Sequence, residues 1–130
     1  MAEYLRWFET LGMHDVDLVG GKNASLGEMI SHLLPLGVQV PGGFATTAQA
    51  YRDFLAKDDL AGRIKAELDA LDVDDVAALA RTGEKIRNLI LEQPFPDGLE
   101  QDITAAYGKL CGAHGDVSVA VRSSATAEDL

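Results

Sequence analysis

The sequence predicts a mixed α/β chain with about five helices and a few short strands. Apolar residues recur three and four positions apart over most of the chain, which is the spacing of one helix face. Two short stretches, Val38–Val40 and Val117–Val121, instead alternate apolar with polar or small residues, as strands do. Glycine and proline clusters separate many of these segments from one another.

The first clear helix is predicted directly after the Gly20-Gly21 pair. Its apolar face consists of Leu26, Met29, Ile30, Leu33 and Leu34. Asn23 or Ser25 can cap its start, and Ser25-Leu-Gly-Glu28 fits a capping box. We expect it to end at Pro35 or Gly37, before the strand at Val38–Val40.

Four further helices are predicted from the same spacing, each with a capping or terminating signal, and the last of them ends before the Gly112–Gly115 turn. Thr46 or Thr47 can cap the first of them, Asp58-Asp59 the second and the run Asp72–Asp75 the third, which Gln93–Pro96 ends. The apolar residues that carry these helices are, in order, Tyr51, Phe54 and Leu55; Leu60, Ile64, Leu68 and Leu71; Val76, Leu79, Ile86, Leu89 and Ile90; and Leu99, Ile103, Ala106, Tyr107 and Leu110.

The last element is a predicted strand at Val117–Val121 whose valine face is buried, with Arg122 on the other face. The hydroxyl-rich and acidic tail from Ser123 to Leu130 ends without a capped element. We therefore expect residues 1–130 to be the N-terminal part of a domain that is truncated at its C-terminal end.

Composition is typical of a globular protein, with 47% apolar and 25% charged residues among 130. The 11 Lys and Arg against 21 Asp and Glu give a net charge of −10, which argues against nucleic acid as a partner. The single Cys111 cannot form an internal disulfide, so a reducing, cytoplasmic location is expected. Neither a secretory signal nor an apolar run of roughly 18 residues is present, so no membrane association is expected.

Two short motifs have the chemistry of a phosphate site. Gly20-Gly21-Lys22-Asn23 stands at a loop-to-helix junction, where backbone N–H groups and the helix dipole favour an anion. Arg122, followed by Ser123 and Ser124, places a bidentate guanidinium and small hydroxyl donors after a strand. From the residues alone, a solvated lysine beside a structural turn and a solvated arginine on a strand face remain the alternatives.

No catalytic residue and no metal site can be assigned from the residues. Cys111 and His114 have a ligand-like spacing, but the chain has no second pair to complete a tetrahedral site. His14 and His32 stand in no motif, and the spacing of the acids is typical of helix caps.

Three stretches, Asp15–Met29, Val40–Thr47 and Val119–Leu130, together resemble the phosphoenolpyruvate synthase (pyruvate, water dikinase) family. The resemblance covers nearly the whole chain in the same order. It implies the first lobe of an ATP-grasp-type domain in an enzyme that converts pyruvate to phosphoenolpyruvate with ATP and water. The resemblance further implies that AMP and phosphate are released through a phosphohistidine intermediate.

This resemblance implies that Lys22 and Arg122 contact the ATP phosphates. The chemistry of the two motifs adds Gly20, Gly21, Ser123 and Ser124 as candidate residues of the same site. The magnesium ligands, the phosphohistidine and the pyruvate site lie beyond Leu130 in the family, so the 130 residues alone are expected to be inactive. A related dikinase, a rifampin phosphotransferase-type enzyme or a noncatalytic helical interaction module remains the alternative. An isolated piece of this kind is also expected to expose apolar surface and unpaired strand edges, with homo-oligomers as one result.

Overall fold

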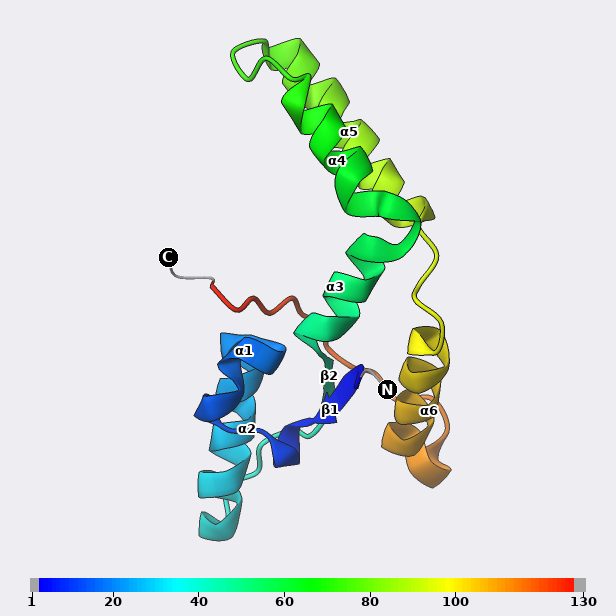
Figure 1. The fold of residues 1–130 in the computed structure, drawn as a ribbon. Coiled ribbons are helices and arrows are strands. Elements are labelled where there is room, and N and C mark those ends of the chain that lie inside the picture. The colour runs from blue at the N-terminus through cyan, green and yellow to red at the C-terminus, as the bar shows by residue number, and fades with distance from the viewer. Residues whose placement is uncertain (1–2, 128–130) are drawn as a thin grey trace. The chain divides into compact units, whose positions relative to one another are not determined.

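The computed structural model describes residues 3–127, which divide into two compact units (Figure 1). The first unit comprises Met1–Tyr51 together with Asp97–Leu130, and the second comprises Arg52–Pro96. Within the described residues, five helices have nine or more residues and two short strands form a sheet. The predicted mixed class with five helices is thereby confirmed.

The sheet of the first unit pairs β1 (Leu5–Trp7) with β2 (Phe44–Thr46) in antiparallel register. Trp7 pairs with Phe44, and their rings meet edge to face with centroids 5.5 Å apart. The strand predicted at Val38–Val40 is wrong, because the chain there pairs with no strand among residues 3–127 and the strand forms at β2, after Gly43, instead. A strand forms where its backbone finds a partner, and β1 offers one only to residues 44–46.

The helical part of the first unit begins with short turns, Phe8–Thr10 and Met13–Asp15, and α1 (Val16–Val19). They are followed by α2 (Gly21–Leu33), a turn at Leu34–Leu36, and later by α6 (Leu99–Cys111) with a closing turn at Gly112–His114. Gly37 adopts φ +83° directly after the Leu34–Leu36 turn, so the predicted end of this helix is confirmed.

The core of the first unit is built around buried Leu11, Val19 and Ala45, with Phe8 and Leu18 packed against them. Helix α2 lies very close to Leu11, because a Cβ atom added to Gly27 would stand 2.5 Å from the Leu11 carbonyl oxygen. Only a glycine permits this approach without displacing the backbone of Leu11.

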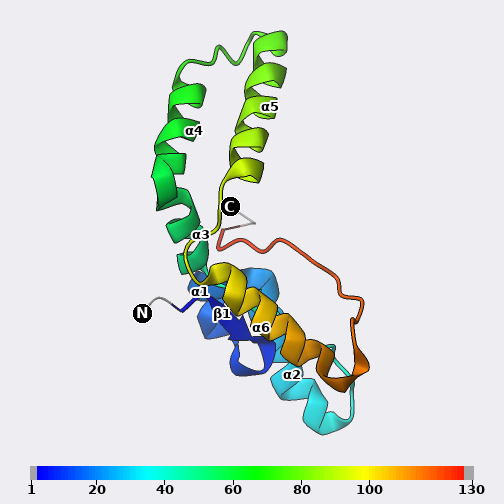
Figure 2. The same ribbon diagram turned by 90° about the vertical axis from the view of Figure 1, so that its right-hand side faces the viewer.

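The second unit is a helical hairpin preceded by the end of α3 (Ala48–Ala56). Helix α4 (Leu60–Asp69) and helix α5 (Val76–Glu92) lie side by side and are joined by the loop at 70–75 (Figure 2). Lys85 and Glu67 form an ion pair between them at 2.7 Å.

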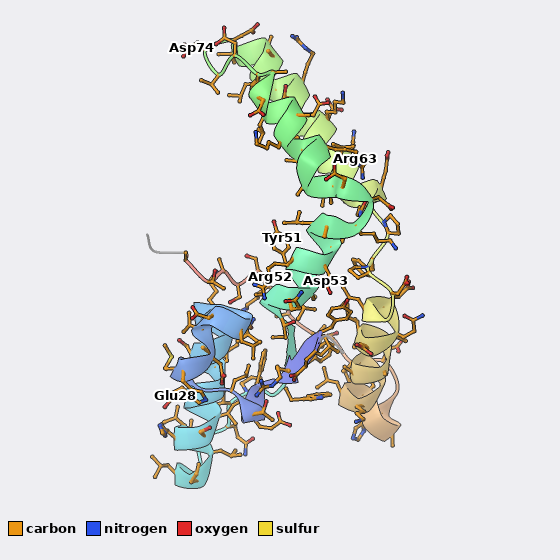
Figure 3. The ribbon with its side chains drawn as sticks, in the orientation of Figure 1. Glu28, Tyr51, Arg52, Asp53, Arg63 and Asp74 are labelled. Carbon is orange, nitrogen blue, oxygen red and sulfur yellow. The ribbon has the colours of Figure 1, made fainter. Side chains whose placement is uncertain are left out.

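Buried Gln93 ties this unit together at the end of α5. Its amide donates to the carbonyl oxygens of Lys57 at 2.7 Å and Phe54 at 3.4 Å, and its Oε1 accepts from Arg63 at 3.1 Å (Arg63 is labelled in Figure 3). The end of α5 predicted at Gln93–Pro96 is confirmed, and Gln93 also links α3, α4 and α5.

The predicted caps have different outcomes. Asp75 accepts from the amide of Ala78 at 3.1 Å, and Thr47 accepts from the amide of Ala50 at 3.3 Å, so both are confirmed. Asp59 holds the cap position of α4 but accepts no capping hydrogen bond, because Asp58 and Asp59 both adopt positive φ. The Asp59 carboxylate lies over Gly62 instead, near the positive end of α4.

The strand predicted at Val117–Val121 is also wrong, since no residue of this stretch is in a strand. Val119 is 49% exposed and Val121 is 91% exposed, so the valine face is not buried. The alternation of valines suits a pleated sheet, but a segment with no neighbouring strand among residues 3–127 has nothing to bury that face. The expectation of exposed apolar surface is confirmed here and at Leu36, Val76 and Leu91.

Candidate functional site

The start of α2 is built on Gly20, which joins two helices. Its amide donates to the Val16 carbonyl at 2.8 Å and closes α1, while its own carbonyl accepts from Ala24 at 3.1 Å and opens α2. This double role requires φ +86° and ψ 164°, a conformation that glycine adopts and residues with a Cβ avoid. The break predicted at the glycine pair is therefore confirmed.

The C-terminal segment of the chain lies directly on this junction. The amide of Gly21 donates to the carbonyl oxygen of Ala125 at 3.1 Å, and the amide of Asn23 lies 3.5 Å from Ser124 Oγ. A Cβ atom on Gly20 would stand 2.3 Å from Ser124 Oγ and 2.9 Å from the Ala125 nitrogen. The two motifs predicted separately from the sequence thus meet in one place, although 101 positions separate Asn23 from Ser124.

Lys22 and Arg122 both flank this contact with exposed side chains. Lys22 lies between the two α2 residues whose amides face the Ser124–Ala125 segment. Arg122 precedes Ser124 by two residues, which span at most about 7 Å when extended. The structure therefore brings the backbones of both predicted cations to the first turn of α2.

The two glycines of the motif differ in their surroundings. Gly20 is covered by Ser124 and Ala125, whereas a Cβ atom on Gly21 would meet nothing within 4 Å. The serines differ in the same way, since Ser124 is half-buried against Gly20 and Ser123 is exposed.

The predicted local caps of α2 are wrong. The side-chain amide of Asn23 donates to the Val19 carbonyl at 2.9 Å, and the Ser25 hydroxyl lies 3.6 Å from Met13 Sδ. Glu28 (labelled in Figure 3) lies in the interior of α2 and is too far along the helix to cap its start. Its carboxylate instead accepts from the Met13 amide at 2.9 Å and lies 2.7 Å from His32 Nε2. Sequence reasoning missed that Ser124 and Ala125 take the capping position, because no local pattern reports a contact between distant residues.

This arrangement changes how an anion would be held. The free amides expected at the helix start already face acceptors, Ala125 for Gly21 and Ser124 for Asn23. Positive charge at the junction therefore comes mainly from the exposed side chains of Lys22 and Arg122.

A second anchor holds the segment that leads to Arg122. The Tyr107 hydroxyl on α6 donates to the carbonyl oxygen of Val117 at 2.7 Å. Hydrogen bonding with the Cys111 side chain, together with burial, raises the pKa of Tyr107 above its ordinary value of 10.0. Tyr107 thus keeps its proton for this bond into the alkaline range.

The described residues show neither a metal-binding cluster nor a membrane-spanning helix. Residues 3–127 contain no group of three or more His, Cys, Asp or Glu side chains placed to hold a metal ion. His14 lies 3.3 Å from the Asp15 carboxylate, and Cys111 is a buried free thiol. None of the helices in this range is both long enough and apolar enough to cross a membrane.

Comparison with known proteins places the chain in a family. The sequence model for the "Pyruvate phosphate dikinase, AMP/ATP-binding domain" matches residues 16–130, a range that contains Lys22 and Arg122. The chain belongs to this family. The resemblance inferred from Asp15–Met29, Val40–Thr47 and Val119–Leu130 is thereby confirmed.

Relatives of the chain carry a consistent name. It is 61% identical over 130 residues to the phosphoenolpyruvate synthase of Pseudomonas aeruginosa, covering 100% of the chain and 16% of that relative. It is 63% identical over 129 residues to the synthase of Neisseria meningitidis, covering 98% of the chain and 16% of the relative. It is 53% identical over 124 residues to the phosphoenolpyruvate synthase of Escherichia coli, covering 95% of the chain and 16% of that relative. The chain thus spans 16% of the length of these relatives.

Proposed function

We propose that the chain is the opening part of the ATP-binding domain of an enzyme that phosphorylates pyruvate to phosphoenolpyruvate. ATP and water are consumed, and AMP and phosphate are released through a phosphohistidine intermediate. The family description, which includes AMP/ATP binding, and the synthase relatives support this proposal over a noncatalytic helical module. We assign residues 1–130 to the first lobe of an ATP-grasp-type domain in a cytoplasmic enzyme.

The proposed site is the junction between the start of α2 and the segment that carries Arg122. The observation that carries it is the hydrogen bond from the Gly21 amide to the Ala125 carbonyl at 3.1 Å, which holds the residue directly after the second motif against the first motif. The residues assigned to direct contact with the ATP phosphates are Lys22 and Arg122, and Gly20, Gly21, Ser123 and Ser124 form the junction that surrounds them.

Lys22 and Arg122 have complementary roles in this proposal. The Lys22 ammonium supplies a compact positive charge to a phosphate oxygen, and the Arg122 guanidinium binds two phosphate oxygens in parallel. Negative charge on the transferring group is stabilised when such cations are already in place before reaction. The exposure of both side chains leaves them accessible to a nucleotide.

Magnesium accompanies ATP in phosphoryl transfer and would neutralise part of the phosphate charge. Magnesium prefers carboxylate oxygens and water in octahedral geometry, and residues 3–127 offer no such cluster of acids. We therefore assign no magnesium ligand and no step through the metal to this part of the chain. Pyruvate binding and the phosphohistidine are likewise assigned to the rest of the enzyme.

The proposal is tested by alanine substitution of the two cations in the full-length enzyme. Lys22→Ala and Arg122→Ala should each slow ATP-dependent phosphoenzyme formation by about a hundredfold or more. The exposed residues Lys109 and Arg87 provide charge-matched controls, and Lys109→Ala and Arg87→Ala should keep the wild-type rate. A wild-type rate in Lys22→Ala or Arg122→Ala would remove that residue from the site.

A further inference from the structure

The segment that carries Arg122 is held at two points within the first unit. At its start, the carbonyl of Val117 accepts from Tyr107, and at its end the carbonyl of Ala125 accepts from Gly21. Residues 118–123 between these anchors are all exposed. The course of the segment near Arg122 therefore depends on the contact with the start of α2.

Gly20 is the surface on which this contact rests. A Cβ atom at Gly20 would lie 2.3 Å from Ser124 Oγ, 2.9 Å from the Ala125 nitrogen and 3.0 Å from the Ala125 oxygen. Because two of these three atoms are backbone, an added methyl group has to displace the segment rather than turn a flexible side chain aside. The positive φ of Gly20 adds backbone strain to any such substitution.

Ser124 and Ala125 also complete the first turn of α2. The Asn23 side chain is occupied with the Val19 carbonyl, so the start of α2 has no local side-chain cap. The Ala125 carbonyl and the Ser124 hydroxyl provide acceptors in its place, at 3.1 Å and 3.5 Å from the Gly21 and Asn23 nitrogens. The contact therefore provides acceptors for the first turn of α2 and at the same time holds the otherwise exposed segment in place.

We infer that Gly20 and Ser124 are positioning residues, which act on ATP through Arg122 by holding its segment against the first turn of α2. The inference rests on the proposed function, because it gives this contact the task of placing the Arg122 guanidinium at the phosphates beside Lys22. Gly20 serves by leaving room for the segment, and Ser124 serves by filling that room.

The contact itself can be measured without nucleotide, in the full-length enzyme, by hydrogen exchange of the peptides that cover residues 117–127. Ser124→Ala should speed their exchange by about threefold to tenfold, as expected for loss of one hydrogen bond and its packing. Ser118→Ala is the matched control, because Ser118 lies in the same segment and is exposed. Its exchange should equal that of the wild type.

Gly20→Ala should have a larger effect than Ser124→Ala on the same peptides, because it adds both a clash and an unfavourable φ. Gly108→Ala is its control, since a Cβ atom there meets nothing within 4 Å. If Gly20→Ala does not yield folded enzyme, the Ser124 variants carry the test alone.

The link to Arg122 is tested by the KM for ATP. Ser124→Ala should raise the KM for ATP. Ser124→Thr should keep the KM near the wild-type value, because threonine retains the hydroxyl, and Ser118→Ala should leave it unchanged. In an Arg122→Ala background, Ser124→Ala should have no further effect, because a residue that acts through Arg122 has nothing left to position.

Wild-type exchange in Ser124→Ala would overturn the inference whatever happens to ATP. Faster exchange with an unchanged KM, or a full additional rise of KM in the Arg122→Ala background, would also overturn it. If Arg122→Ala and Lys22→Ala both leave the KM and phosphoenzyme formation unchanged, the proposed function fails as well, and the exchange data then report only a structural contact.

Discussion

The close approach of α2 to Leu11 makes Gly27→Ala a sharp test of the packing. Alanine in place of glycine inside a helix is favourable by about 1 kcal/mol from intrinsic propensity. The added Cβ would, however, stand 2.5 Å from Leu11 Cβ, 2.5 Å from its carbonyl oxygen and 2.7 Å from its carbonyl carbon. Leu11 is 3% exposed and its amide is bonded to the Phe8 carbonyl at 3.0 Å, so it has little room to retreat.

Overpacking of this kind costs about 1 to 3 kcal/mol or more, and contact with backbone atoms belongs at the upper end. The packing term therefore outweighs propensity, and Gly27→Ala should lower the free energy of unfolding by about 1 to 2 kcal/mol. Gly108→Ala provides the opposite case, because Gly108 lies in helix α6 with no atom within 4 Å of the added Cβ. It should raise the free energy of unfolding by about 0.5 to 1 kcal/mol.

Urea titrations of the 130-residue chain, followed by far-UV circular dichroism, give the two unfolding midpoints. With a slope of about 1 to 2 kcal/mol per molar urea, the midpoints of the two variants should differ by about 1 M or more. A Gly27→Ala protein as stable as the Gly108→Ala protein would refute the close packing of α2 on Leu11.

Three further predictions concern single residues. Gln93→Leu should destabilise the second unit by about 1 to 3 kcal/mol, because it removes the three hydrogen bonds that buried Gln93 makes to Phe54, Lys57 and Arg63, and faster hydrogen exchange in α4 and α5 would report it; wild-type exchange would contradict it. Asp75→Ala should cost about 1 kcal/mol in urea unfolding through loss of the α5 cap, whereas Asp74→Ala should stay within about 0.5 kcal/mol; equal losses would contradict the assignment. Because the pKa of Tyr107 is raised in the folded state, protonated Tyr107 stabilises the fold fully below pH 10.0. This contribution is lost as the pH rises through the pKa of Tyr107 in the folded state. Unfolding measured on both sides of pH 10.0 should show a smaller alkaline loss in Tyr107→Phe, and an identical loss would argue against it.

Elements marked by local signals could be predicted well from the sequence. Helix α5 follows a side-chain cap at Asp75 and ends before Pro94, and α2 begins after Gly20 and continues into a turn that ends at Gly37. Each of these signals acts within a few residues, through a hydrogen bond, a missing amide or a permitted φ. Sequence neighbours therefore indicate where these helices begin and end, although Ser124 and Ala125 also contribute acceptors at the start of α2.

The errors in the strands and in the caps of α2 involve partners that are distant in sequence. Alternation of valines predicted a strand at Val117–Val121, but sheet formation needs a second strand, and residues 3–127 place none beside it. The sequence predicts Asn23 or Ser25 as the cap of α2, because no local sequence pattern indicates that Ser124, 101 positions after Asn23, contacts the start of this helix. Residues 128–130, part of the third stretch that carried the family resemblance, lie outside the described residues.

Part of the candidate site could be predicted from the sequence and part could not. Lys22 and Arg122 were found by the chemistry of their motifs, and the structure adds that the Gly21 to Ala125 hydrogen bond joins those motifs. The different surroundings of Gly20 and Gly21 could not be predicted, because both occur as the same residue in one short motif.

The central claim is that this chain supplies part of an ATP site. It is tested most directly by calorimetric titration of ATP with magnesium into the 130-residue chain and into a longer chain that includes the whole nucleotide-binding domain, each with and without Arg122→Ala. We predict that the longer chain binds ATP and loses affinity on substitution, while the 130 residues alone bind weakly or not at all. Absence of ATP binding in both chains, or binding that Arg122→Ala does not change, would contradict the account.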